Sequence, residues 1–257
     1  MVTSAPPKVP VTPVPAATLL LLRDSAEGIE VLLTTRHKAA GFAAGAAVFP
    51  GGKLDSDDRA RARTDRAGDP FRIAAIRETF EESGILLARR DADGAMLSGA
   101  QLVELVAQQA SSPEFSGFIA GTKLTLATDL LVPFAHWITP VDQPKRYDTR
   151  FFLAPAPPGQ TARHDGHEAV EVHWLTAEGA IAAARAGRIK LVMATRLNLL
   201  KLGRSKTVAD ALDAARRSEI VTVEPELVQT DRGPAFRIPA AADYGMTEML
   251  VSGYSRA

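Results

Sequence analysis

Short runs of apolar and β-branched residues, separated by polar turns, recur along most of the chain. They predict strands at 17–23, 29–36, 46–49, 132–138, 147–154 and 168–175. The first two strands are joined by Asp-Ser-Ala-Glu-Gly, whose residues favour a turn. A last hairpin is expected at 219–228 and 234–238, with Asp-Arg-Gly at its turn.

Apolar residues at helical spacing predict a second set of elements, at about 70–83, 99–110, 176–186, 189–202 and 207–217. Strands and helices do not alternate strictly along the chain. This order indicates an α+β fold, in which helices pack on a mixed β-sheet.

The chain is expected to divide into three parts. Residues 1–14 are rich in proline and have no apolar core, so we expect a flexible tail. Residues 15–187 form the main domain, with two segments that look like insertions, the charged run 55–68 and the helical region 88–126. Residues 188–257 are expected as a C-terminal extension packed on the same domain, because no linker-like stretch precedes them.

Composition narrows the function. The 257 residues are 46% hydrophobic, and Lys+Arg and Asp+Glu are both 30, so the net charge is zero. Proteins that bind nucleic acid or membrane surfaces carry a basic excess, so neither partner is expected. The chain has no cysteine, which excludes disulfides, thiolate metal sites and a cysteine nucleophile. The N-terminus lacks the pattern of a secretion signal, and a cytoplasmic location is expected.

The segment around 70–83 carries the signals of a capped helix. Asp69 can cap its start, and Pro70 suits the first helical position, where a missing N–H is no loss. Gly84 can adopt the left-handed conformation that ends many helices. One narrow arc of this helix is apolar and is expected to face the core; it consists of Ile73, Ile76, Phe80 and Leu87.

A second face of this helix is acidic. Glu78, Glu81 and Glu82 are spaced i, i+3, i+4, so their carboxylates emerge on one side, and Arg77 can pair with Glu81. A solvated acidic face is the ordinary interpretation of such a cluster. However, the helix macrodipole disfavours acidic residues near a C-terminus. Converging carboxylates are what Mg²⁺ or Mn²⁺ requires, with substrate phosphates completing the shell, so we favour a metal site.

The stretch Arg-Glu-Thr-Phe-Glu-Glu-Ser-Gly-Ile at 77–85 resembles the second half of the Nudix box, and Phe-Pro-Gly-Gly at 49–52 resembles its start. The usual box has a glutamate where this chain has Asp58. It also has a shorter gap before the arginine than the 18 residues, 59–76, found here. Interrupted boxes of this kind are similar to those of the mammalian peroxisomal coenzyme A diphosphatases. The role of Asp58 is left open.

The stretch before the box is similar to a signature of coenzyme A pyrophosphatases. The residues in register are Leu32, Leu33, Thr34, Arg36, Gly45, Phe49, Pro50, Gly51 and Gly52. His37 stands in place of a small residue, and Gly41 in place of a second arginine.

The resemblance implies a Nudix-type α/β/α sandwich in which Glu78, Glu81 and Glu82 hold Mg²⁺ or Mn²⁺. It also implies that Arg77 takes part in catalysis with Glu81 and Glu82. The general base is left open between a box glutamate and a carboxylate from a later loop. Glu168 is the favoured loop candidate, because Glu171 is more readily explained as a charge at a strand edge. The catalytic set is therefore Glu81, Glu82, Arg77 and Glu168.

Three further residues are expected to meet the substrate. Gly51 and Gly52 let the backbone approach it closely, because neither carries a side chain. Arg36 can donate to a phosphate, although a surface strand residue is an equal alternative. His164 and His167 precede Glu168 in the same loop. They are interpreted as exposed turn residues rather than metal ligands.

Three functions are compatible with the sequence. The first is a diphosphatase that splits coenzyme A or acyl-CoA into adenosine 3′,5′-bisphosphate and 4′-phosphopantetheine. The second is a Nudix diphosphatase acting on ADP-ribose, NADH or dinucleoside polyphosphates, which the loss of arginine at Gly41 favours. The third is a nucleotide sensor with low turnover. The expected partner is a small-molecule nucleoside diphosphate derivative, and the helix at 99–110 and the extension could form a homodimer interface or a lid.

Overall fold

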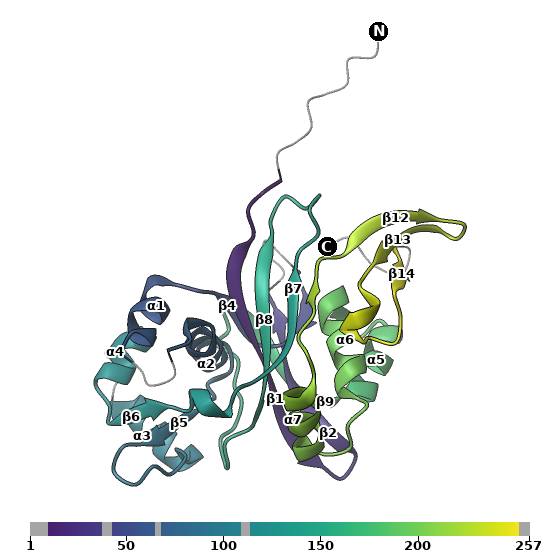
Figure 1. The fold of residues 1–257 in the computed structure, drawn as a ribbon. Helices are drawn as coiled ribbons and strands as arrows, with labels where there is room; N and C mark the ends of the chain where they lie inside the picture. The colour runs from purple at the N-terminus through teal and green to yellow at the C-terminus, as the bar shows by residue number, and fades with distance from the viewer. Residues whose placement is uncertain (1–9, 38–42, 65–67, 109–113, 252–257) are drawn as a thin grey trace.

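The computed structural model describes residues 10–37, 43–64, 68–108 and 114–251 of the chain. A central mixed sheet lies between two layers of helices, as Figure 1 shows. Its main path runs β10-β3-β2-β1-β8-β7-β11, with β4 paired to β1 and β9 paired to β2. The strands are β1 (Val14–Ser25), β2 (Gly28–Arg36), β3 (Ala46–Val48), β4 (Gly51–Lys53), β7 (Val132–Ile138), β8 (Tyr147–Pro155), β9 (Ala169–Thr176), β10 (Lys190–Leu191) and β11 (Thr222–Val223).

The continuous apolar run in β1 follows from cover on both faces of the sheet. Leu20 and Leu22 point into one core cluster, whereas Leu19 and Leu21 point into the other. Strands buried on both faces are apolar throughout rather than alternating. β1 pairs in parallel with β8 and antiparallel with β2, so the sheet is mixed as expected.

One layer comprises the elements between β4 and β7. They are α1 (Ser56–Ala62), α2 (Pro70–Ser83), β5 (Ala88–Arg90), α3 (Gly99–Gln108), α4 (Phe115–Ala120), β6 (Leu124–Leu126) and a 3-10 turn η1 (Thr128–Leu130). α2 packs directly on β1, and the other elements surround it (Figure 1). The two expected insertions therefore lie in this layer, although 65–67 and 109–113 lie outside the described residues.

The other layer contains the elements that follow β9. They are α5 (Ala177–Arg185), α6 (Met193–Leu202), α7 (Val208–Arg217), β12 (Glu226–Thr230), β13 (Gly233–Arg237), a 3-10 turn η2 (Ala240–Ala242) and β14 (Glu248–Leu250). Leu197, Leu199 and Phe236 share a core cluster with Leu20 and Trp137 of the sheet. The part of the extension that is described thus packs on the main sheet.

Most predicted elements are confirmed, with several differences. The region expected as helical, 88–126, begins and ends with strands β5 and β6, which pair with each other. The helix expected at 189–202 begins at Met193, because Lys190 and Leu191 pair with β3 instead. In the last hairpin, only 226–230 pairs with 233–237, while Thr222 and Val223 pair with β7. The charged run 55–68, for which no element was predicted, contains the short helix α1. None of the helices in the described parts has the length and apolar character needed to span a bilayer.

Candidate active site

The caps that the sequence predicts for α2 are confirmed. The Asp69 side chain accepts a hydrogen bond from the backbone N–H of Phe71, and Pro70 occupies the first turn. Gly84 ends the helix in the left-handed conformation with φ 69°, and its N–H donates to the Phe80 carbonyl. These caps fix where the helix begins and ends, and hence where its carboxylates lie.

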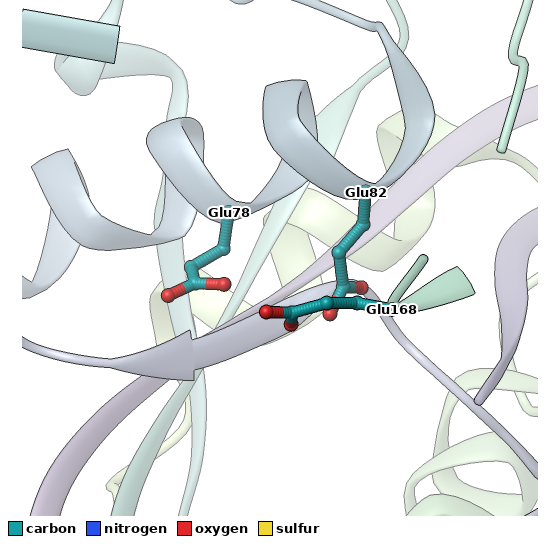
Figure 2. Close-up of side chains that lie close together, drawn as sticks. All are labelled: Glu78, Glu82 and Glu168. Atoms are coloured by element: carbon teal, nitrogen blue, oxygen red, sulfur yellow. The ribbon is translucent and has the colours of Figure 1, made fainter. Parts of the chain in front are cut away.

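Three carboxylates converge below α2. Figure 2 shows Glu78 and Glu82 on the same side of α2, pointing toward Glu168 from the loop before β9. One oxygen of each lies within 4.8 Å of the others. Glu82 is only 3% exposed and Glu78 only 9%, whereas Glu168 is exposed. The cluster is therefore buried on its helix side and open to solvent on its loop side.

This arrangement leaves negative charge uncompensated. Burial raises the pKa of Glu82 to about 8, and the neighbouring charge of Glu78 adds to the shift. Burial likewise raises the pKa of Glu78 to about 7. The hydroxyl of Thr34 donates to Glu82 at 3.2 Å, and the nearest arginine nitrogen, Nη1 of Arg36, is 3.9 Å away. For Glu82, one weak contact and one distant cation do not replace the lost hydration, and for Glu78 an ion pair with Arg77 at 2.9 Å only partly offsets it.

The residues present fit a divalent cation. Carboxylate oxygens alone line the cluster, which is the donor chemistry that Mg²⁺ and Mn²⁺ prefer. The Glu78 carboxylate also lies against Gly52, where an added Cβ would overlap it. Glu78 and Glu82 would hold such an ion, with Glu168 beside them on the solvent side.

Glu81 lies apart from this group. Its carboxylate pairs with Nη1 of Arg77 at 2.8 Å, and its side chain is 43% exposed. Helical geometry explains the separation, since residues three and four positions after Glu78 lie on opposite sides of it. Among the described residues, the structure thus groups the predicted ligands Glu78 and Glu82 with Glu168. A direct metal contact by Glu81, which also lines the pocket, stays a prediction.

Arg77 is the centre of a second network. Its Nε and Nη2 donate to both oxygens of Asp58, at 3.1 and 3.0 Å. Nη2 also donates to the Lys53 carbonyl at 2.9 Å, and Nη1 lies 2.9 Å from Glu78. Burial would lower the arginine pKa, but these acids raise it overall, so Arg77 is charged. Arg77 therefore connects α2, α1 and β4 and orients the acidic face.

Asp58 acquires a role that the sequence left open. It is 1% exposed, and it lies on α1, where it forms a capping box with Asp55. Its side chain is one methylene shorter than the usual glutamate. The helix formed by the inserted segment brings this shorter carboxylate to Arg77.

The Glu168 loop is held by Asp165. The Asp165 carboxylate accepts from the backbone N–H groups of His167, Glu168 and Ala169, at 3.2, 3.0 and 2.8 Å. Partial burial would raise the pKa of Asp165, but these donors outweigh it and lower the pKa overall. The Arg163 N–H donates to the Ser83 carbonyl at 2.8 Å and so joins the loop to the end of α2. His164 and His167 are exposed, as predicted.

The predicted substrate residues line one pocket beside the carboxylates. Its volume is about 510 Å³, and Arg36, Gly51, Gly52, Glu78 and Glu168 lie in its wall. An added Cβ on Gly51 would overlap Thr18 and the Ala17 carbonyl, so glycine permits this close strand packing. Nε of Arg36 is buried and has no hydrogen-bond partner among the described residues. Gly41 lies outside the described residues.

The sequence missed one wall of this pocket. Met193, Pro225 and Phe236, all from the segment after 188, line it. No motif marks these residues. Their apolar character predicts burial, but only the tertiary fold shows that they border a pocket.

Residues 64–196, more than half of the chain, match the NUDT19 Nudix domain family. The chain is 29% identical to nudix hydrolase 7 of Caenorhabditis elegans over 180 residues, which are 68% of this chain and 56% of that relative. It thus spans little more than half the length of this curated relative. A crystal structure of a NUDIX hydrolase from Alicyclobacillus acidocaldarius is 29% identical, with a TM-score of 0.67, and the match covers 79% of this chain and 96% of that one. The fold is therefore the Nudix fold, and the chain belongs to the NUDT19 Nudix domain family of Nudix hydrolases.

Proposed function

We propose that this chain is a metal-dependent diphosphatase that hydrolyses coenzyme A or acyl-CoA. The products would be adenosine 3′,5′-bisphosphate and 4′-phosphopantetheine. The observation that carries the proposal is the cluster of Glu78, Glu82 and Glu168 at one end of a pocket. A diphosphate repels both the carboxylates and an attacking hydroxide, so this cluster suits the substrate only together with a divalent cation.

Each part of the site has a chemical task. When bound, the ion neutralises phosphate oxygens and makes a nearby water more acidic. Glu78 and Glu82 would hold it, while Glu168, open to solvent, would accept the proton of the attacking water. That water forms a bond to phosphorus as the bridging P–O bond breaks. Arg36 would donate to a phosphate oxygen, and its unpartnered buried Nε supports this role.

Support for coenzyme A comes from the residues in register with the pyrophosphatase signature, which extend from Leu32 to Gly52. A pocket of about 510 Å³ is also within the usual range for small-molecule sites. ADP-ribose, NADH or a dinucleoside polyphosphate is the alternative, because Gly41 replaces an arginine of that signature. A sensor with low turnover is favoured less, since the three glutamates in the second half of the box are present.

The test is a substrate panel with product analysis. Purified protein with Mg²⁺ or Mn²⁺ is incubated with coenzyme A, ADP-ribose, NADH and diadenosine tetraphosphate in ¹⁸O-labelled water. We expect the two products above from coenzyme A, with one product carrying ¹⁸O on its new phosphate oxygen. Coenzyme A left intact while another substrate is cleaved would refute the substrate, and no cleavage at all would favour the sensor. Glu81→Gln and Glu82→Gln are expected to lower turnover by orders of magnitude while the protein stays folded.

A further inference from the structure

The pocket extends well beyond the carboxylates. The part farther from them, here called the far part, is lined by Trp137 from the sheet and by Met193 and Phe236 from the extension. Three threonines and one glutamine, whose side chains carry hydroxyl and amide groups, also line the pocket: Thr139, Thr149, Thr195 and Gln143. Flat aromatic groups beside a few amide and hydroxyl groups suit a nucleobase, which stacks on aromatic rings and offers hydrogen-bonding edges.

Buried hydrogen bonds fix the extension against the sheet here. Nε1 of Trp137 donates to the hydroxyl of Tyr244 at 2.8 Å, and that hydroxyl donates to Oδ1 of Asn198 at 2.8 Å. Phe236 is 5% exposed and packs in the same cluster. The far part of the pocket is therefore pre-formed rather than assembled by the ligand.

Strand register places the far part relative to the carboxylates. Gly52, which contacts Glu78, pairs with Ala17, and Ala17 pairs with Arg150 of β8. Tyr147 also lines the pocket and lies three residues earlier on β8, so a rise of about 3.3 Å per residue separates the two levels by roughly 10 Å. A nucleoside whose 5′-phosphate sits at the carboxylates would extend along this direction.

Lys145 lies at the rim of this far part. It is exposed, it lines the pocket, and its Nζ is 5.7 Å from the ring centroid of Tyr147. No carboxylate forms an ion pair with it among the residues that the structure describes. An unpaired cation at the edge of an aromatic pocket is suited to an anionic group on the ligand.

We propose that the far part of the pocket binds the adenosine half of the substrate and that Lys145 contacts a phosphate on its ribose 3′-oxygen. The inference rests on the proposed function and adds a basis for selecting coenzyme A over diphosphates without this group. The pantetheine arm would then lie outside this pocket, because it carries neither an aromatic ring nor a charge for Lys145 to meet.

The test compares ligands that differ only in the 3′-phosphate. Calorimetry would measure binding of adenosine 3′,5′-bisphosphate and of AMP to the wild type, Lys145→Met, Lys145→Arg and the matched surface control Lys206→Met. We expect the wild type to prefer the bisphosphate about tenfold, with the preference lost in Lys145→Met, kept in the control and largely restored by arginine. An unchanged preference in Lys145→Met would overturn the inference.

A second pair of measurements separates this inference from the proposed function. Coenzyme A and dephospho-coenzyme A are compared by kcat/KM, with the same variants. If coenzyme A is cleaved but Lys145→Met discriminates as the wild type does, the inference fails and the function stands. If neither substrate is cleaved but the bisphosphate preference depends on Lys145, the function fails and the binding site stands.

A separate variant tests whether the aromatic side chain of Phe236 contacts the base. Phe236→Leu keeps an apolar side chain in the core, and its melting temperature shows whether the variant is folded. We expect weaker binding of both nucleotides by a similar factor, since both carry the same base. Unchanged binding of both would overturn the placement of the base.

Discussion

Replacing Glu82 with glutamine removes a buried carboxylate and keeps its shape and most of its contacts. Without a metal, this side chain is protonated in the folded protein up to about pH 8, but it ionises near 4.5 when the chain unfolds. The unfolded state therefore releases a proton over this range, and the free energy of unfolding falls as pH rises. We expect Glu82→Gln to be more stable than the wild type in EDTA at neutral and alkaline pH.

The structure gives the magnitude of this gain. Each pKa unit corresponds to about 1.4 kcal/mol, so the shift of Glu82 corresponds to about 3 kcal/mol at pH 7 and at most about 5 kcal/mol above pH 8. Both figures are upper limits, because Glu78 shares the repulsion. Below about pH 4.5 the carboxylate is protonated in both states, and the gain should vanish. For a chain of this size, about 3 kcal/mol is roughly 6 to 12 °C in melting temperature.

The assay is thermal unfolding from pH 4.5 to 8.5, with EDTA or with Mg²⁺ or Mn²⁺, for the wild type, Glu82→Gln and the exposed control Glu27→Gln. A metal at one hundred times its dissociation constant should stabilise the wild type by about 2.7 kcal/mol and the Glu82 variant far less. The control should follow the wild type throughout. Equal melting temperatures of wild type and Glu82→Gln in EDTA at pH 8 would refute the reasoning, as would equal stabilisation of both by metal.

Three further substitutions test the supports of the site. Asp58→Ala leaves the buried Arg77 without its bidentate partner, so unfolding in urea should show a loss of about 3 to 5 kcal/mol, and a near-neutral effect would contradict this role. Gly52→Ala places a methyl group on the Glu78 carboxylate, so Mn²⁺ affinity measured by electron paramagnetic resonance should fall; undiminished affinity would show that this approach is not required. Asp165→Ala removes the acceptor that holds the Glu168 loop, so kcat and Mn²⁺ affinity should fall at least tenfold with little change in KM. An equal loss in an exposed control such as Glu27→Gln would contradict a specific effect.

Local signals made much of the fold predictable. Apolar runs identified six strands of the sheet, and caps at Asp69 and Gly84 gave α2 its observed limits. The short strands β4 and β10 were missed, because two or three residues carry no usable periodicity. β11 was expected within the last hairpin, but it pairs with β7. Such short strands are stabilised by pairing with neighbouring strands, which the local sequence does not show.

The candidate site was predictable where its residues share one helix. Helical spacing alone places Glu78 and Glu82 on one face, and Arg77 within reach of Glu81. Contacts between segments far apart in the chain could not be derived in this way. The pairing of Asp58 with Arg77 depends on the inserted helix α1. The part of the pocket wall formed by Met193 and Phe236 depends on how the extension packs on the sheet.

Anomalous diffraction from a crystal soaked with Mn²⁺ and a non-hydrolysable coenzyme A analogue tests the central claim most directly. We expect a manganese peak bounded by the carboxylates of Glu78, Glu82 and Glu168, with diphosphate oxygens of the analogue completing its shell. A crystal that binds the analogue with no manganese among these carboxylates, or with the metal held elsewhere, would contradict it.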